Sequence, residues 1–394
     1  MKIFILIFIL GILQSQDCDA GFEMIDEFCY ASTDIEFLKN LKNLNDVDIE
    51  NILMVGQQTW LEGRLIHFWI GDWPLGHDIQ IQIIPNSINQ LNALERLVIQ
   101  WNPLTSLPHE ICELNQLNEL GLDRNQLTEL PSCIGNLDQL INLSAVDNNL
   151  RSIPPAIDGL VNMLHLNLSD NQLMFIPSEI GNLTQLETLN LRNNRLTVLP
   201  LEISQLSSLI SLVAENNQLM ELPNGFGQLT SLQYLHLDHN FIFSFTDDFW
   251  NLDNLTMAYL DDNQFTSVPD NIFELDNLGS LTMNHNKISE LPQDICSISE
   301  GNVYLSFSQN KICPPYPDCL SESAYSNQDV SECIDFLLED INLDHTVDIH
   351  DIQELMNMIF NPDTYQSNSN PDINHDGVIN LLDINLVIQY ILNG

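Results

Sequence analysis

Hydrophobic positions recur at a fixed period along the middle of the chain. From Ile84 to Glu290 the repeating unit reads LPxxIxxLxxLxxLxLxxNxLxx, and residues 176–198, IPSEIGNLTQLETLNLRNNRLTV, form one clear copy with Ile176 at the first leucine position. A fixed period of this length predicts a solenoid in which each repeat makes one coil. Asparagines keep the same step at Asn102, Asn125, Asn148, Asn171, Asn194, Asn217, Asn240, Asn263 and Asn286.

Each copy of the repeat predicts a short strand followed by an irregular return. In LETLNL, Leu189 and Leu191 alternate with Thr188 and Asn190, so the leucines face the core and the polar residues face outward. The fixed asparagine turns inward after the strand, where its amide can satisfy backbone groups of neighbouring coils. We expect the return to be extended or loosely helical, because the proline near its start has no N–H to donate. Stacked coils therefore predict a parallel sheet whose outward residues line a curved, concave face.

This repeat resembles that of the leucine-rich repeat family. The resemblance implies an α/β solenoid of the horseshoe type, with a parallel concave β-sheet, over residues 84–313. The last coil, 291–313, carries one extra residue, which moves its asparagine to Asn310. We expect residues 17–83 to form an N-terminal cap, with a degenerate first strand within 63–72, and residues 314–336 to form a disulfide-closed cap and linker.

A second duplication follows near the end of the chain: DINLDHTVDIHD begins at Asp340 and DINHDGVINLLD begins at Asp372. Oxygen donors at positions 1, 3, 5, 9 and 12, with a backbone carbonyl at position 7, are what Ca²⁺ requires. The first loop offers Asp340, Asn342, Asp344, the Thr346 carbonyl, Asp348 and Asp351. The second offers Asp372, Asn374, Asp376, the Val378 carbonyl, Asn380 and Asp383.

Amphipathic helices are predicted after each loop, at 352–360 and 384–393, whereas Pro371 argues against a helix entering the second loop. Residues 337–394 therefore resemble a type I dockerin domain, a small α-helical calcium-binding unit, and the resemblance implies a cohesin-like partner. His345 stands at position 6 of the first loop, where glycine usually makes the sharp turn, which leaves calcium binding by that loop open. The alternative is a solvated acidic tail.

The richest part of the expected concave face belongs to three coils between residues 222 and 290. Tyrosine rings there offer stacking surfaces, and histidine and aspartate offer polar contacts, which together predict a ligand site. The alternative is that outward strand positions are polar without binding anything, and a metal site of His236, Asp238 and His239 is a further option. The predicted ligand-binding residues are Tyr234, His236, Asp238, His239, Tyr259, Asp261, Asp262 and His285.

Charge excludes several classes of partner. The chain has 55 Asp and Glu against 11 Lys and Arg, a net charge of −44, so nucleic-acid binding and attraction to anionic membranes are both disfavoured. Residues 1–16 combine one lysine with an apolar run from Ile3 to Leu13, which predicts a secretory signal peptide; the alternative is a buried N-terminal element. That run is too short to span a membrane. We therefore expect an extracellular or cell-surface protein.

The eight cysteines fit an oxidising compartment, where pairing is the default. Their clustering predicts the disulfide Cys18–Cys29. Three pairings remain open among the last four, Cys296, Cys313, Cys319 and Cys333.

Enzyme signatures such as GxSxG, HExxH and a phosphate loop do not occur in the sequence, so we expect no catalysis. The leading hypothesis is a secreted, non-catalytic protein that recognises a protein or glycan on its concave face. Its dockerin-like tail, with Ca²⁺ as cofactor, would attach it to a cohesin-like or cell-surface partner. Alternatives are a structural or adhesive spacer and an accessory component of an extracellular polysaccharide-degrading complex.

Overall fold

The structure is a computed structural model. It describes residues 18–71, 79–292, 295–296, 303–314, 316–317, 319–330, 349–360 and 378–393, with the single positions 333, 341 and 373. The predicted signal peptide lies outside these residues. The chain divides into two compact units, which we describe separately. The first comprises residues 1–195 and 205–209, and the second comprises residues 196–204 and 210–394.

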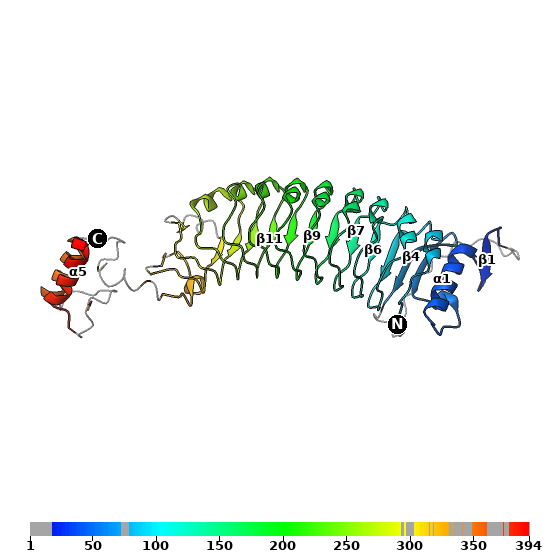
Figure 1. Ribbon diagram of the computed structural model, residues 1–394, viewed down its shortest axis with the longest axis horizontal. Helices are drawn as coiled ribbons and strands as arrows, with labels where there is room; N and C mark the ends of the chain where they lie inside the picture. Colours follow the sequence, from blue (N-terminus) through cyan, green and yellow to red (C-terminus); the bar gives the residue numbers. More distant parts are fainter. Residues whose placement is uncertain are drawn as a thin grey trace. The chain divides into compact units, whose positions relative to one another are not determined.

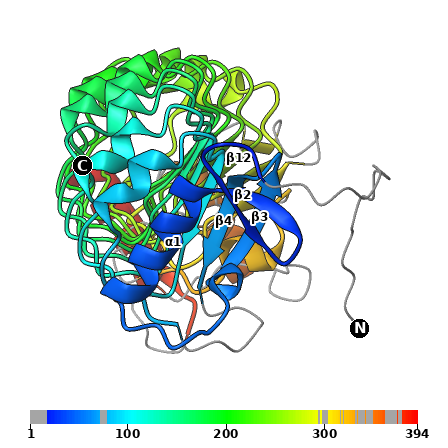
Figure 2. The same cartoon turned by 90° about the vertical axis from the view of Figure 1, so that its right-hand side faces the viewer.

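The first unit opens with elements that do not follow the repeat. A hairpin of β1 (Phe22–Ile25) and β2 (Phe28–Ala31) leads into α1 (Ser32–Leu44). Helix α1 lies against β2, as Figure 2 shows. The short 3₁₀ helix η1 (Ile52–Met54) follows. Next, β3 (Gln57–Leu61) pairs antiparallel with β4 (Arg64–Ile70). The strand expected within 63–72 is β4, but its antiparallel neighbour departs from the expected all-parallel sheet.

Helix α1 anchors this region through one apolar face and one buried charge. Ile35, Phe37, Leu38 and Leu41 are fully buried. Asp34 is also buried, and it accepts hydrogen bonds from Arg64 Nε at 3.0 Å and from the backbone N–H of Leu65 at 2.8 Å. A buried carboxylate is tolerated when it is paired and hydrogen-bonded in this way. The contact therefore joins α1 to the first strand of the repeat region.

The coils of both units carry one short strand each. Within each unit the strands of consecutive coils pair in parallel (Figure 1). In the first unit these are β5 (Arg96–Ile99), β6 (Glu119–Gly121), β7 (Asn142–Ser144), β8 (His165–Asn167) and β9 (Thr188–Asn190). In the second they are β10 (Ser211–Val213), β11 (Tyr234–His236), β12 (Met257–Tyr259), β13 (Ser280–Thr282) and β14 (Tyr304–Ser306).

Return segments run as 3₁₀ turns, in agreement with proline at the start of most of them. Pro177, for example, precedes a turn whose Ile180 is fully buried. The 3₁₀ geometry tolerates a missing N–H donor at its first position. The turns are η2 (Asn86–Gln90), η3 (His109–Glu113), η4 (Ile134–Asn136), η5 (Pro155–Gly159), η6 (Ser178–Asn182), η7 (Leu201–Gln205), η8 (Phe226–Gln228), η9 (Phe249–Asn251), η10 (Asp270–Glu274) and η11 (Glu322–Tyr325).

Leucines and asparagines of the repeat hold adjacent coils together as predicted. Leu189 and Leu191 are at most 1% exposed. Asn194 lies behind them; its Nδ2 donates to the Leu168 carbonyl of the preceding coil at 3.0 Å, and its Oδ1 accepts the N–H of Leu173 at 2.9 Å. Similar bonds recur within each unit, at Asn125, Asn148 and Asn171 in the first and at Asn217 and Asn310 in the second, so the buried amides form a ladder along the coils of each unit.

Four disulfides are present. The predicted Cys18–Cys29 bond is confirmed, and Cys112–Cys133 joins two neighbouring coils. Among the four late cysteines, left open by the sequence, the pairs are Cys296–Cys319 and Cys313–Cys333. These two bonds tie the last coil to the segment that follows it.

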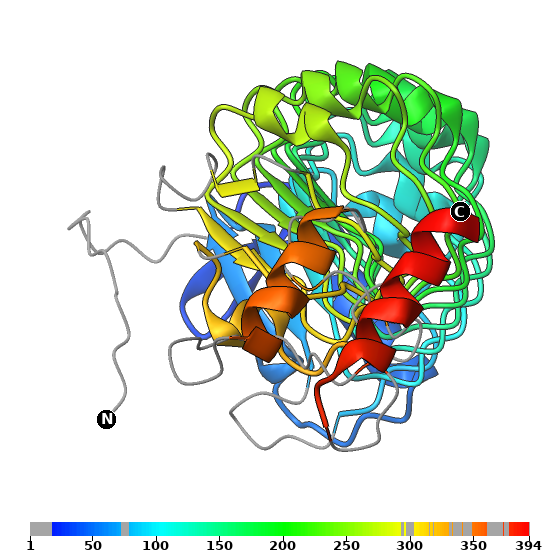
Figure 3. The ribbon, with the colours of Figure 1, turned by 90° about the vertical axis from the view of Figure 1, so that its left-hand side faces the viewer.

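Two helices close the chain, α4 (Ile349–Phe360) and α5 (Leu381–Asn393), and they lie side by side (Figure 3). Each begins three residues before its predicted start, because the last residues of each loop already lie in the first helical turn. Their shared core is small; it consists of Ile341, Leu355, Met358, Ile373, Ile384 and Val387. In the part of the chain that is described, no helix combines the length and apolarity needed to cross a membrane.

Candidate functional site

The exposed sheet face of the second unit carries three side-chain positions per coil. In the coil of β11 they are Tyr234 and His236, which begin and end the strand, and Asp238, two residues past its end on the same side. The parallel register places the equivalent residues of β12 beside them, with Tyr234 opposite Met257 and His236 opposite Tyr259. Residues separated by one repeat are therefore direct neighbours on this face.

Several aromatic side chains lie at the first two of these positions, among them Tyr234, His236 and Tyr259. The ring of His236 meets the ring of Tyr259 edge-on, with 4.8 Å between centroids. Tyr234 and Met257 are 37% and 38% exposed, and Tyr304, in β14, is 61% exposed. The structure thus brings the predicted residues Tyr234, His236 and Tyr259 onto one surface. Large exposed rings are the side chains that most often anchor a bound partner.

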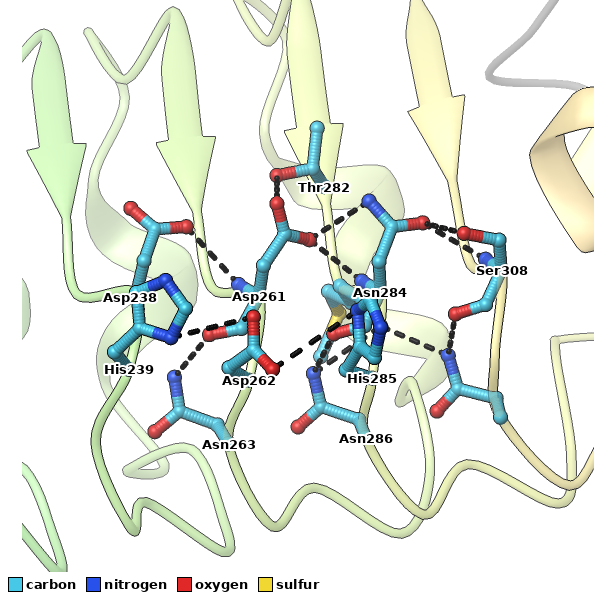
Figure 4. A network of polar contacts seen from close by, with 12 residues as sticks. Asp238, His239, Asp261, Asp262, Asn263, Thr282, Asn284, His285, Asn286 and Ser308 are labelled. Atoms are coloured by element: carbon cyan, nitrogen blue, oxygen red, sulfur yellow. Dashed lines mark hydrogen bonds and ion pairs between the residues drawn. The ribbon is translucent and has the colours of Figure 1, made fainter.

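Aspartates at the third position bond to the backbone of the following coil (Figure 4). Asp238 Oδ1 accepts the N–H of Asp261 at 3.1 Å. Asp261 Oδ1 accepts the N–H of Asn284 at 2.6 Å, and Asp261 Oδ2 accepts the hydroxyl of Thr282 at 2.9 Å. Both oxygens of Asp261 are therefore engaged inside the protein, so this predicted ligand residue has a structural role.

Three further predicted residues, His239, Asp262 and His285, share a backbone conformation. Their φ angles are 54°, 54° and 52°, in the left-handed region. Asn, Asp and His adopt this region more readily than most residues, which gives a backbone reason for their occurrence here. Asp262 links the other two, with its carboxylate oxygens 3.3 Å from Nδ1 of His239 and 3.9 Å from Nδ1 of His285 (Figure 4).

The electrostatics of this face depend on how far each group is desolvated. Burial is the main reason why the pKa of the Asp238 carboxyl is raised to about 6; backbone hydrogen bonds lower this pKa, and the neighbouring Asp261 and Glu215 carboxylates raise it. Burial lowers the pKa of His236, against an opposing effect from Glu215. Both groups are thus held toward their neutral forms.

Sequence reasoning missed Glu215, Met257 and Tyr304 as members of this face. The signal was available, because Glu215 stands one full repeat before Asp238 and Met257 stands one full repeat after Tyr234. Tyr304 is shifted by the extra residue in the last coil, yet it still pairs in register with Ser280.

Carboxylates at position 12 of the two predicted calcium loops are buried. Asp351 Oδ1 accepts the N–H of Ile341 at 2.7 Å, and Asp383 Oδ1 accepts the N–H of Ile373 at 2.9 Å. The same bond therefore joins position 12 to position 2 in both loops, so each loop closes on itself. Buried carboxylates on closed loops of oxygen donors fit Ca²⁺.

In the second loop the described donors also begin the helix. Asn380 Oδ1 accepts the N–H of Leu382 at 2.8 Å, while Asp383 Oδ2 accepts the N–H of Asn380 at 2.8 Å. This is a reciprocal capping arrangement at the start of α5. Asn380 Nδ2 donates to the carbonyl of Val378 at 2.8 Å. The other predicted calcium ligands lie outside the described residues; they are Asp340, Asn342, Asp344, Thr346, Asp348, Asp372, Asn374 and Asp376.

Two family models match the sequence. A leucine-rich repeat region matches residues 155–258, and a dockerin type I domain matches residues 338–392. A search of curated proteins found no match.

Solved structures of similar fold are leucine-rich repeat proteins. One, from Leptospira interrogans, is 30% identical, with 70% of this chain and 76% of that protein covered and a TM-score of 0.53. The ectodomain of the Arabidopsis thaliana receptor kinase GASSHO1/SCHENGEN3 is 25% identical, with a TM-score of 0.54 over 71% of this chain. A TDR receptor is 26% identical, with a TM-score of 0.56 over 62% of this chain. The match covers only 38% and 44% of these two receptor chains.

The repeat and its asparagine ladder thus agree with the leucine-rich repeat model and with the Leptospira structure, and the two duplicated loops, each with a buried aspartate at position 12, agree with the dockerin model. The chain belongs to the leucine-rich repeat proteins and ends in a type I dockerin domain.

Proposed function

We propose that the chain is an extracellular, non-catalytic binding protein with two separate binding surfaces. The sheet face of the second unit recognises a protein or a glycan, and the dockerin domain attaches the chain to a cohesin-like or cell-surface partner when Ca²⁺ is bound. The four disulfides and the dockerin match support an extracellular setting.

The observation that carries the proposal is the apolar surface of the dockerin domain. Ile349 and Leu381 occupy equivalent positions of the two duplicated loops and are 68% and 66% exposed. Leu382 and Phe360 are exposed as well. Several large apolar side chains exposed on so small a domain are typical of a protein that binds a partner through them.

The solenoid surface is supported by its exposed aromatic side chains. Tyr234, Met257 and Tyr304 lie at the same position of their coils, and Tyr259 lies beside His236. The structure of the GASSHO1/SCHENGEN3 ectodomain holds a bound partner, CASPARIAN STRIP INTEGRITY FACTOR 2. That example supports a protein or peptide ligand for the solenoid here.

A cohesin-binding assay on the full chain tests the tail. Purified cohesin domains are presented on a surface, and the chain is applied in millimolar Ca²⁺ or in EDTA. We expect binding by the wild type in Ca²⁺, loss in EDTA, and loss in the double variant Ile349→Ser/Leu381→Ser. The double variant Tyr234→Ala/Tyr259→Ala serves as the matched control and should bind cohesin normally.

A glycan array and a peptide array test the solenoid with the same two variants. Recognition predicts a ligand that Tyr234→Ala/Tyr259→Ala no longer binds, while Ile349→Ser/Leu381→Ser binds it as the wild type does. Equal binding by both variants would remove this face from the proposal. The spacer and the accessory component of a polysaccharide-degrading complex would then remain, since both require only the tail to bind.

A further inference from the structure

Three potential metal ligands meet on the sheet face of the second unit: Glu215, His236 and Asp238. His236 ends β11, and Asp238 follows two residues later on the same side of the chain. Glu215 holds the position of Asp238 in the preceding coil, because Val213 pairs with His236. One donor atom from each residue lies within 4.8 Å of the other two.

Neighbouring groups fix the orientation of two of these ligands. Asp238 is held by the N–H of Asp261 at 3.1 Å, and the His236 ring is held against Tyr259. All three ligand side chains are partly buried. Partners that orient a ligand in this way are the usual support of a metal site, since less freedom is lost when the ion binds.

The donor set distinguishes this cluster from the calcium loops. Ca²⁺ and Mg²⁺ take oxygen donors, whereas one imidazole nitrogen with two carboxylate oxygens suits Zn²⁺. A divalent cation would also offset the mutual repulsion of the carboxylates of Glu215, Asp238 and Asp261 in a chain with a net charge of −44.

We propose that Glu215, His236 and Asp238 bind a zinc ion on the sheet face of the solenoid. Three protein ligands leave the fourth position of a tetrahedral ion open to water or to a donor atom of a bound partner. The metal site suggested by the sequence contained His239 instead of Glu215. His239 is not part of the proposed site, because it lies against Asp262. In the described residues a second cluster, His109 with Cys112 and Cys133, is not equivalent, because its sulfurs form a disulfide.

Isothermal titration of the full chain with ZnCl₂ tests the proposal, in a non-chelating buffer with excess Ca²⁺ to keep the dockerin loops filled. We expect one saturable zinc site in the wild type. His236→Ala and Glu215→Gln should each weaken it at least about tenfold, because loss of even a supporting residue has an effect of that size. His285→Ala, which removes an exposed histidine outside the cluster, should leave the affinity unchanged.

Titration with Co²⁺ adds a spectroscopic check, since a tetrahedral site with nitrogen and oxygen donors gives visible absorption bands that His236→Ala should abolish. Glu215→Gln keeps the shape of the side chain, and its circular dichroism without zinc should match that of the wild type. Absence of a saturable zinc site in the wild type would overturn the proposal. Wild-type affinity in a folded Glu215→Gln variant, or a loss caused equally by His285→Ala, would also overturn it.

Discussion

The solenoid and the dockerin domain are stabilised in different ways. Each solenoid coil buries leucines against its neighbours and satisfies buried backbone groups with an asparagine such as Asn194, so its stability is built from repeated local contacts. The dockerin core contains few side chains, and each of its two loops holds a buried carboxylate, Asp351 or Asp383. We therefore expect the repeated fold to be stable without a metal and the small duplicated domain to depend on one.

Removal of calcium should produce the largest difference in stability between the solenoid and the dockerin domain. Helices α4 and α5 contain 12 and 13 residues, against 13 in α1, so unfolding of the dockerin domain would remove most of the α-helical signal of the described residues. We expect EDTA to cause this loss in far-ultraviolet circular dichroism and to leave the thermal transition of the solenoid in place. Asp383→Ala should have the same effect in the presence of Ca²⁺. Retention of the helical signal in EDTA would contradict the expectation that the dockerin domain depends on calcium.

Truncation of a ladder asparagine should weaken the solenoid alone. Asn194→Ala leaves the Leu173 N–H and the Leu168 carbonyl without their partner, which should cost about 2–4 kcal/mol and lower the solenoid Tm by several degrees. Asn190→Ala, on the sheet face of the same coil, is the matched control and should cost below about 1 kcal/mol. Calorimetry on both variants checks this, and equal effects would refute the role of the ladder.

Substitution at a left-handed position should have a smaller effect. Asn216 has φ of 54°, and Asn216→Val places a β-branched residue in this conformation, at a cost of about 1–2 kcal/mol. Asn216→Gly should change the free energy of unfolding by less than about 0.5 kcal/mol, because glycine adopts this conformation freely. Urea denaturation followed by fluorescence measures both. A valine variant as stable as the glycine variant would argue against backbone strain at this position.

The pH dependence of Asp238 should give the smallest effect. Its folded pKa of about 6 lies above its ordinary value of 3.8, so the folded state holds the proton more tightly and loses stability as the pH rises from about 4 to 6. Asp238→Asn mimics the protonated form and should raise stability above pH 6, by at most about 1 kcal/mol because solvent reaches the carboxyl, and leave it unchanged at pH 4. Thermal melts in zinc-free buffer at the two pH values test this; a gain of the same size at pH 4 would contradict it.

The repeat made most of the solenoid predictable. Its period placed the strands, the buried leucines and the inward asparagines, because each position has the same environment in every coil. The pairing of Cys18 with Cys29 also followed from the sequence, whereas the pairing of the late cysteines required their positions in space. Helix α1 and the antiparallel strand β3 were missed, since the cap region has no internal repetition that fixes its geometry.

The candidate site was predictable in part. Alternation along each strand identified Tyr234, His236 and Tyr259 on one face, but hydrogen-bond partners such as those of Asp261 depend on distances that a pattern does not contain. Glu215 lies in the coil before the aromatic positions, and its place beside His236 and Asp238 depends on the register of β10 with β11. The start of helix α5 was misplaced because Asn380 serves both the loop and the helix cap.

The asparagine ladder has a consequence for how such a chain can change in length. Each of these asparagines links its own coil to the coil before it: Asn194 bonds to Leu168 and Leu173 of the preceding coil and to the carbonyls of Leu191 and Arg192 in its own. Duplication or deletion of one whole repeat unit would leave every remaining rung with an equivalent partner. A gain or loss of whole repeats could therefore lengthen or shorten the proposed binding face of the sheet. The cap regions before the first coil and after the last coil would not have to change.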